Sequence, residues 1–242
     1  METKQPKAKK AKKESKGFRG IESAFLVIVV CFIIAVCIYT FILGDVNNFT
    51  DATKAEPKPG NMLGTIYKGG IIVPVLQTLL LTVLVLSIER AFAIMTAKGK
   101  GSLTKFVANV KAALAANDLA KAQEYCDKQR GSVGSVVTSA LKKYAEMENN
   151  TELTKEQKLA SIQKEVEEAT ALELPTLEMN LAVIATMTTL GTLVGLLGTV
   201  LGMIRSFAAL ATATGAPDSV ALSTGISEAL VNTAFGIATG AC

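Results

Sequence analysis

The sequence predicts an all-α membrane protein with four transmembrane helices and a small cytoplasmic helical domain. Charged residues make up 19% of the 242 residues, and four long stretches are almost free of them. Each stretch reaches the roughly 18 residues that cross a hydrocarbon core about 30 Å thick. Buried helices of a large soluble protein are the alternative, but so short a chain would have too little polar surface to cover four of them. Between the second and third stretches, apolar residues instead recur at helical intervals.

The ends of the apolar stretches set the predicted spans and connections. The stretches have 20 to 26 residues each, and the last contains one charged residue, Glu228. An extended connection at 45–68, which contains Pro and Gly, joins the first two spans, and a turn at 213–219 joins the last two. We expect transmembrane helices at residues 21–44, 69–94, 179–212 and 220–242.

The tail at residues 1–20 carries eight lysines and arginines against two glutamates. A basic segment before an apolar run is also typical of a signal peptide or of an arm that binds nucleic acid. However, the run at 24–43 exceeds the apolar core of a signal peptide, about 7–15 residues, and no small-residue cleavage site follows it. By the positive-inside rule we predict a cytoplasmic N-terminus, with 45–68 and 213–219 in the periplasm. Basic residues after the second stretch agree with this orientation: Arg90, Lys98, Lys100 and Lys105.

The segment 95–178 is the predicted cytoplasmic domain. It holds twelve basic and twelve acidic residues, which argues against a nucleic-acid partner or a lipid-binding patch. The helix that starts at Lys155 runs into the third span, where Pro175 predicts a kink or a restart. Further helix signals are an N-cap candidate at Asn117-Asp118, a break at Arg130-Gly131 and a capping box of Thr154 and Gln157.

Glycines form a stripe along the third span. At 100° per residue the four glycines fall within about 60° of one another, so another helix can approach closely there. They are Gly191, Gly195, Gly198 and Gly202. Three threonines lie on the neighbouring arc, at Thr188, Thr192 and Thr199. Their hydroxyls either contact a partner helix or a wet path, or simply bond the preceding turn of their own helix.

Glu228 is an ionisable residue about nine residues into the fourth span. Such residues are costly in a membrane and mostly functional. Thr224, Asn232 and Thr239 lie within about 40° of Glu228 on the helical wheel, so this face is a candidate pore or partner-helix face, together with Thr188 and Thr192. Without a cationic partner, a glutamate in this position favours its neutral form. The structural alternative is a protonated glutamate that only joins two helices.

Counting from the turn brings Thr199 and Thr233 to one level. If Ala216 is the midpoint of the turn, each threonine lies 17 residues from it in an antiparallel pair. Glu228 then lies between this level and the periplasmic surface, although it is about 140° from Thr233 on the wheel. Arg205 is expected near the same surface, where its side chain extends into the interface.

Three motifs together resemble the ExbB/TolQ branch of the MotA/TolQ/ExbB proton channel family. The third span contains GLLGTVLG at 195–202, followed by Ser206-Phe207, and the fourth contains GISEALVNTA at 225–234. The second span ends in Ile-Glu-Arg at 88–90. The resemblance covers about 69–242, and the first helix, at 21–44, is then an addition to a three-span family plan.

The resemblance implies a homopentamer of long helices around a pore. The pore would hold the single helix of an ExbD/TolR-type partner, and the complex would act on a TonB- or TolA-type protein from the inner membrane. It also implies that Thr199 and Thr233 line the pore and that Glu228 is the membrane glutamate of the family. The resemblance implies no cofactor or metal. Because family members continue the last helix past the membrane, we expect a sequence truncated at Cys242.

Other functions stay open at this point. A stator for motility and a sodium-coupled motor belong to the same family, and a scaffold that only assembles through the glycine stripe is a different class. An enzyme is disfavoured, because the chain has no histidine and shows no nucleophile–base set or metal-ligand spacing. The glycine stripe also lacks the lysine of a phosphate-binding loop.

Overall fold

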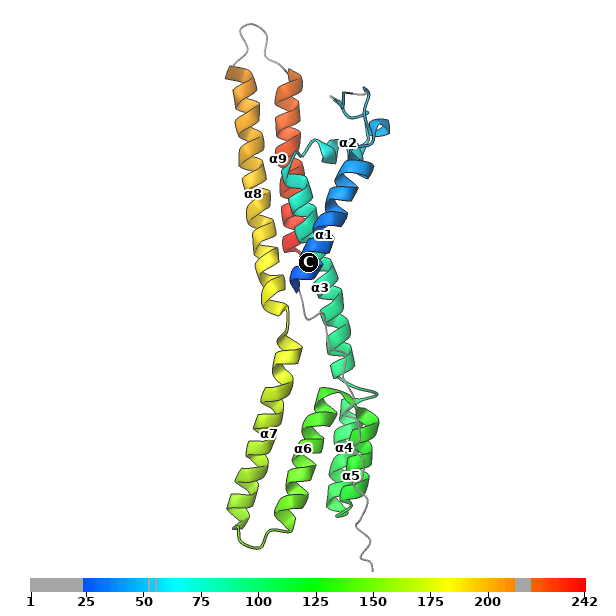
Figure 1. The fold of residues 1–242 in the computed structure, drawn as a ribbon, viewed down its shortest axis with the longest axis vertical. Coiled ribbons are helices and arrows are strands. Elements are labelled where there is room, and N and C mark those ends of the chain that lie inside the picture. Colours follow the sequence, from blue (N-terminus) through cyan, green and yellow to red (C-terminus); the bar gives the residue numbers. More distant parts are fainter. Residues whose placement is uncertain (1–23, 52, 55, 212–218) are drawn as a thin grey trace, which may run out of the picture. The chain divides into compact units, whose positions relative to one another are not determined.

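The computed structural model describes residues 24–51, 53–54, 56–211 and 219–242, and it forms helices with no strand in these ranges. Figure 1 shows the chain, which divides into two compact units. One contains residues 93–177, and the other combines the described residues up to Phe92 with those from Glu178 onward. The predicted all-α class is confirmed. The tail at 1–20 and most of the turn at 213–219 lie outside the described residues.

Four helices are long and apolar enough to cross a membrane, as predicted. α1 (Ala24–Cys37) continues into the π-helix η1 (Ile38–Leu43), so together they have 20 residues. α3 (Ile72–Ala97) has 26 residues, and α9 (Ser219–Gly240) has 22. α8 (Leu181–Ala211) is the longest with 31 residues, or about 46 Å, which exceeds a hydrocarbon core of about 30 Å.

α8 and α9 pack as a close antiparallel hairpin (Figure 1). All four glycines of the predicted stripe are buried in it. A Cβ atom built on Gly195 would lie 2.8 Å from the Cα of Gly236, so the two backbones touch where neither residue has a side chain. This spacing is the close approach that small residues permit between membrane helices.

The connection at 45–68 is folded rather than extended, which corrects the sequence-based expectation. It contains the short helices η2 (Val46–Asn48) and α2 (Met62–Tyr67). Asn61 Nδ2 donates to Asn48 Oδ1 at 3.0 Å, which ties the two ends of the connection together. The Tyr67 ring stacks on Tyr39 at 4.7 Å and meets Phe49 edge-on at 5.4 Å. Aromatic packing across 28 residues of separation was not visible in local composition.

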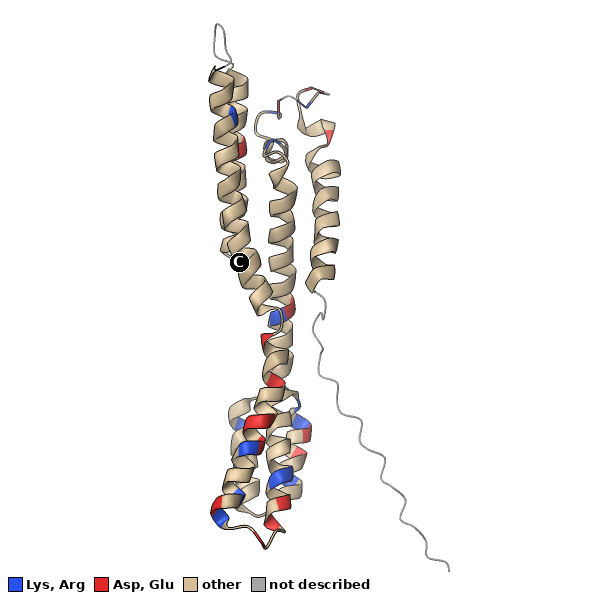
Figure 2. Cartoon of the chain, turned by 60° about the vertical axis from the view of Figure 1, so that its left-hand side comes forward, with Lys and Arg blue, Asp and Glu red and all other residues tan. Residues whose placement is uncertain are grey.

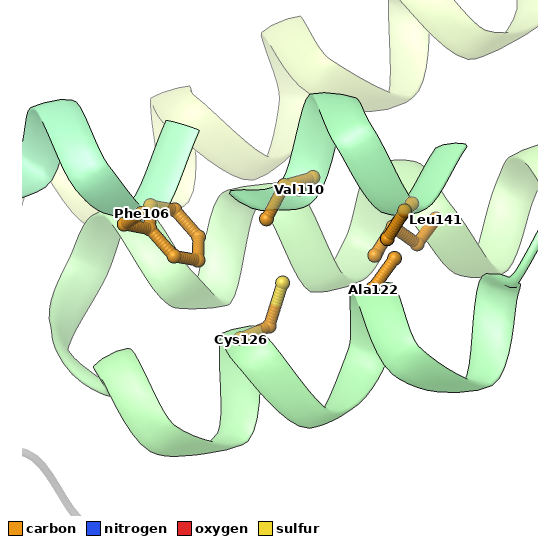
Figure 3. Packing of buried hydrophobic residues seen from close by; sticks show 6 residues of the cluster. Phe106, Val110, Ala122, Cys126 and Leu141 are labelled. Atoms are coloured by element: carbon orange, nitrogen blue, oxygen red, sulfur yellow. The ribbon is translucent and has the colours of Figure 1, made fainter. Parts of the chain in front are cut away.

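The unit that contains residues 93–177 is a small helical bundle. Its helices are α4 (Leu103–Ala115), α5 (Leu119–Gln129), α6 (Gly131–Glu148) and α7, which begins at Lys155 and ends at Glu178. Figure 3 shows its apolar core, where residues of three helices meet. The buried residues of this core are Phe106, Val110, Ala113, Ala122, Cys126 and Leu141.

The predicted helix signals of this bundle are confirmed. The Asp118 side chain accepts a hydrogen bond from Lys121 N, so Asp118 caps α5. Thr154 N donates to the Gln157 side chain at 2.9 Å, and Gln157 N donates back to the Thr154 hydroxyl at 3.4 Å. This reciprocal pair is the capping box. Arg130, with a φ of 54°, interrupts the helical conformation between α5 and α6.

The junction of α7 and α8 differs from the prediction in its place. Pro175 lies inside α7, which continues to Glu178. The chain leaves the helical conformation at Asn180 instead, between α7 and α8, where φ is 65°. Asparagine tolerates this left-handed conformation better than most residues, and it interrupts the helix although proline does not.

Charge separates the helices of the two units (Figure 2). Lys, Arg, Asp and Glu gather on α4 to α7, whereas α8 and α9 are almost free of charged residues. The exceptions on these two helices are Arg205 and Glu228. On α3, Glu89 and Arg90 form a buried pair in which Arg90 Nη2 donates to Glu89 Oε1 at 2.6 Å. Arg90 is therefore paired within α3, whereas the sequence analysis considered it only as one of the basic residues after the second span.

Candidate functional site

The polar face of α9 packs against the glycine stripe of α8. Asn232 and Thr239 are fully buried, and Glu228 is nearly so. A Cβ atom on Gly198 would lie 2.5 Å from Asn232 Cβ, and one on Gly191 would lie 2.5 Å from Thr239 Cγ2. Two residues of the predicted pore or partner face thus lie inside the hairpin, because glycines leave the space that their side chains fill.

Glu228 has a cationic partner, which corrects the expectation of an unpaired carboxyl group. Arg205 on α8 donates from Nη1 to Glu228 Oε1. The Arg205 side chain is 56% exposed and that of Glu228 is 5% exposed. Helical side chains lean toward the N-terminus of their own helix, so in this antiparallel pair the two side chains lean toward each other. Arg205 is therefore not a free interfacial side chain.

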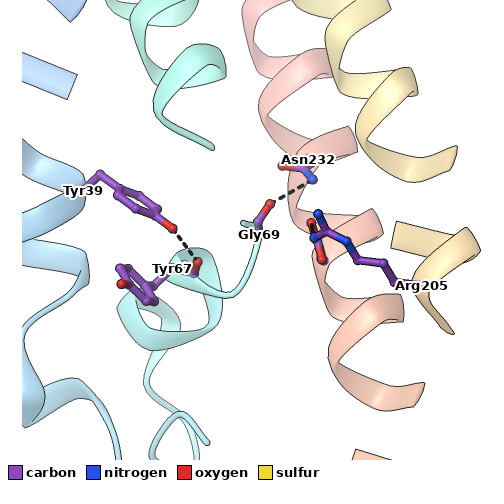
Figure 4. Close-up of polar contacts among 6 residues, drawn as sticks. Tyr39, Tyr67, Gly69, Arg205 and Asn232 are labelled. Carbon is purple, nitrogen blue, oxygen red and sulfur yellow. Dashed lines mark hydrogen bonds and ion pairs between the residues drawn. The ribbon is translucent and has the colours of Figure 1, made fainter. Parts of the chain in front are cut away.

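A glycine turn closes the site from a third direction. Gly70 lies just before α3 with a φ of 76°, and a Cβ atom there would lie 2.5 Å from Glu228 Oε1 and 3.4 Å from Arg205 Nη1. Asn232 Nδ2 donates to the Gly69 carbonyl at 3.1 Å (Figure 4). The turn thus packs its backbone directly on the ion pair, in a conformation and a space that suit glycine.

The first span is linked to this turn through the aromatic cluster. The Tyr39 hydroxyl of η1 donates to the Tyr67 carbonyl at 3.3 Å, two residues before Gly69 (Figure 4). Gly44, which follows η1, lies against the Tyr67 ring. The additional first helix is therefore packed onto the segment that covers Glu228.

The contacts bring Thr199 and Thr233 close to one level, as expected. Because Gly198 lies opposite Asn232, the two threonines are about 3 Å apart along the hairpin axis. Thr199 Oγ1 donates to the Leu196 carbonyl at 2.5 Å, and Thr233 Oγ1 donates to the Ala229 carbonyl at 3.1 Å. Each hydroxyl proton is thereby occupied, but each oxygen can still accept a hydrogen bond from water.

The remaining threonines of the candidate site are divided between two environments. Thr188 and Thr192 bond the carbonyls of Ala185 and Thr188, in the preceding turn of α8. Thr192 is exposed along α8, and Thr224 on α9 is half-buried. The back-bonding alternative that the sequence left open is thus the one observed for the α8 threonines.

Sequence reasoning missed a buried polar set on α3. Gln77, Thr78 and Thr82 are buried, and Thr78 Oγ1 donates to the Pro74 carbonyl at 2.7 Å. Within the described part of the chain, Gln77 Oε1, Thr82 Oγ1 and Asn232 Oδ1 are buried without a hydrogen-bond partner. The spacing of these polar residues within an apolar run was a signal for one polar side of α3. Arg205 also gave a signal, as a lone cation that opposes the positive-inside rule.

Comparison with known proteins gives two matches. Residues 132–242 match the model of the MotA/TolQ/ExbB proton channel family. A relative from Synechocystis sp., described as an ExbB-like biopolymer transport protein, is 42% identical over 73 residues. That alignment covers 30% of this chain and 35% of the relative. The matched family region contains α8 and α9, with Arg205, Glu228 and both level-matched threonines.

These matches agree with the helices themselves. The family is one of channel and transport proteins rather than an enzyme class. With four apolar helices of spanning length, the chain is a multi-pass membrane protein. Through residues 132–242, just under half of its length, it is similar to the MotA/TolQ/ExbB proton channel family.

Proposed function

We propose that this protein is a proton-conducting subunit of an inner-membrane motor. It would assemble as a homopentamer, hold the helix of an ExbD/TolR-type partner, and convert proton-motive force into work on a TonB- or TolA-type protein. The observation that carries the proposal is Glu228, a nearly buried carboxylate in an apolar hairpin of a proton channel family. Ionisable groups in such positions mark ion and proton pathways.

The two level-matched threonines could extend the proton path from this carboxylate along the hairpin. Thr199 and Thr233 lie about 5–8 Å further along the axis than Glu228, counted at about 1.5 Å per residue. Their hydroxyl oxygens can order water although their protons are bonded to the backbone. In this proposal, water between Glu228 and the level of the two threonines carries the proton. The other subunits and the partner helix of the assembled complex line the rest of this water-filled path.

Substitutions at these residues test the proposal in the complex with its membrane partner. We expect Glu228→Ala and Thr233→Val to abolish proton flux into liposomes and energised uptake in cells, while the complex still assembles. Thr186→Val is the matched control, because Thr186 is an exposed α8 threonine whose hydroxyl also bonds its own helix. Wild-type flux in the Glu228 and Thr233 variants would contradict proton conduction and favour a non-conducting scaffold.

Energised uptake separates the alternatives within the family. Replacement of sodium by potassium at constant pH leaves uptake unchanged if protons are carried, and abolishes it if the motor is sodium-coupled. A stator for motility would give the same flux, but its Glu228 variant would lose movement rather than outer-membrane uptake.

A further inference from the structure

Glu228 is contacted by groups from two different segments. Arg205 contacts it from α8, and the Gly70 backbone covers it from the turn before α3. Arg205 is the cation that contacts Glu228 among the described residues. Because the carboxylate is nearly buried and the guanidinium is more than half exposed, the pair keeps the charge of Glu228 compensated while Arg205 remains open to water or to a neighbour.

The pair also lies close to the ends of two apolar helices, which we take as one boundary of the apolar layer. Gly69 and Gly70, which contact Asn232 and Glu228, directly precede α3, and Gly44 directly follows the first apolar helix. Two of the four apolar helices thus end near the level of Glu228. The polar connection at 45–68 begins there, whereas α8 and α9 continue for about nine residues, or about 13 Å, beyond it.

The contact with a guanidinium bears on the form in which a carboxyl group is held. A single carboxylate at such a boundary would favour its neutral form if only desolvation acted on it, whereas a guanidinium in contact favours the charged form. Arginine stays protonated in proteins, so the attraction is permanent while the pair is closed. Gly70 limits where the carboxylate can move, since even one added carbon atom on Gly70 would lie 2.5 Å from Glu228 Oε1.

We propose that Arg205 is a positioning residue, which holds Glu228 charged and in place at the boundary of the apolar layer. The pair must open before Glu228 takes up a proton from water, and closure of the pair returns that proton to the water between Glu228 and the level of Thr199 and Thr233. This inference rests on the proposed function for its role in flux. The charged state of Glu228 stands on the ion pair itself and is measured separately.

Infrared spectroscopy of the full-length complex in liposomes tests the charged state. The difference between wild type and Glu228→Gln is expected to show carboxylate bands at neutral pH, without the carbonyl band of a protonated acid. The difference between Arg205→Gln and the double variant Arg205→Gln/Glu228→Gln is expected to show that carbonyl band. Arg205→Lys keeps the carboxylate bands, and Lys58→Gln, which removes an exposed cation from the 45–68 connection, leaves the spectrum unchanged.

Proton flux tests the role of the pair. We expect Arg205→Gln to lower flux by about tenfold or more, because Glu228 no longer releases its proton, and Arg205→Lys to keep most of it. Carboxylate bands in Arg205→Gln, a protonated Glu228 in wild type, or unchanged flux in Arg205→Gln would each overturn the inference. Flux absent from wild type, with the spectra as expected, would instead contradict the proposed function.

A charge swap keeps the test decisive if Arg205→Gln does not fold. Arg205→Glu with Glu228→Arg retains one cation and one carboxylate across the same hairpin. If the pair positions the carboxylate, the swap assembles and the carboxyl group that α8 then carries shows carboxylate bands. A swapped variant that assembles with a protonated carboxyl group would overturn the inference.

Discussion

Gly198 of α8 lies against Asn232 of α9, and this contact sets the register of the hairpin. Asn232 is fully buried, and its Nδ2 is bonded to the Gly69 carbonyl, so it cannot easily move aside. The sequence located the glycine stripe and the polar face separately. It could not show that they face each other, because a helical wheel gives angles within one helix and not the rotation of two helices against each other.

We expect Gly198→Ala to destabilise the hairpin. Alanine in a helix gains up to about 1 kcal/mol over glycine, but the new Cβ atom would lie 2.5 Å from Asn232 Cβ, and overpacking costs about 1–3 kcal/mol. Thermal unfolding in detergent, followed by circular dichroism, should show a lower midpoint. Ala238→Val adds bulk at an exposed position of α9 and should leave the midpoint near wild type. A higher midpoint for Gly198→Ala would contradict the packing described here.

The Cys126 thiol in the helical bundle gives a pH-dependent stability. Burial raises the pKa of Cys126, the hydrogen bond with Thr138 partly lowers it, and the charge of Asp127 raises it further. The unfolded thiol therefore ionises at lower pH than the folded one. The neutral thiol favours folding below the ordinary cysteine pKa of about 8.5, and this contribution is lost as pH rises above that value.

We therefore expect wild-type stability to fall more steeply above pH of about 8.5 than that of Cys126→Ala. The measurement is denaturant unfolding of the full chain between neutral and alkaline pH. Cys242→Ala is the control, because Cys242 is exposed and its removal should keep the wild-type slope. Equal slopes for wild type and Cys126→Ala would show that the Cys126 thiol does not titrate differently in the two states.

At the scale of elements, the caps could be predicted and the helix break could not be placed. Asp118 and the Thr154–Gln157 box act within three residues of sequence, so their signals are local. Pro175 gave an equally local signal, yet α7 continues past it for three residues. One missing N–H donor at Pro175 does not end α7, whereas the left-handed backbone of Asn180 cannot continue a right-handed helix.

Substitution of Asn180 tests this explanation of the break. We expect Asn180→Gly to change stability by less than about 0.5 kcal/mol, since both residues adopt a positive φ and both serve at helix starts. Asn180→Val should cost about 1–2 kcal/mol, because a β-branched residue is strained in this conformation. Ala182→Val, exposed two residues later, controls for valine in the helix. Thermal unfolding is the measurement. Equal midpoints for all three variants would show that the backbone of Asn180 does not cause the helix break.

For the whole molecule, composition was sufficient to predict the class, and contacts between helices were needed for the site. The lengths of the uncharged stretches predicted four spans, because the membrane thickness sets the length of an apolar helix. Glu228 was found for the same reason, as a charge within such a stretch. Its pairing with Arg205, 23 residues away, and its cover by Gly70 depend on how three segments pack, which no local pattern encodes.

Membrane orientation is a whole-molecule property that labelling can test. In a chain without its native cysteines, we expect Lys58→Cys to react with a membrane-impermeant maleimide in spheroplasts, because 45–68 is predicted to be periplasmic. Glu152→Cys, exposed in the loop between α6 and α7, should react only after the membrane is permeabilised. A single apolar helix of spanning length, α3, separates the two sites, so the predicted topology places them on opposite sides of the membrane. Labelling of both sites in spheroplasts, or of Glu152→Cys alone, would contradict the orientation set by the basic tail and the proton path drawn from it.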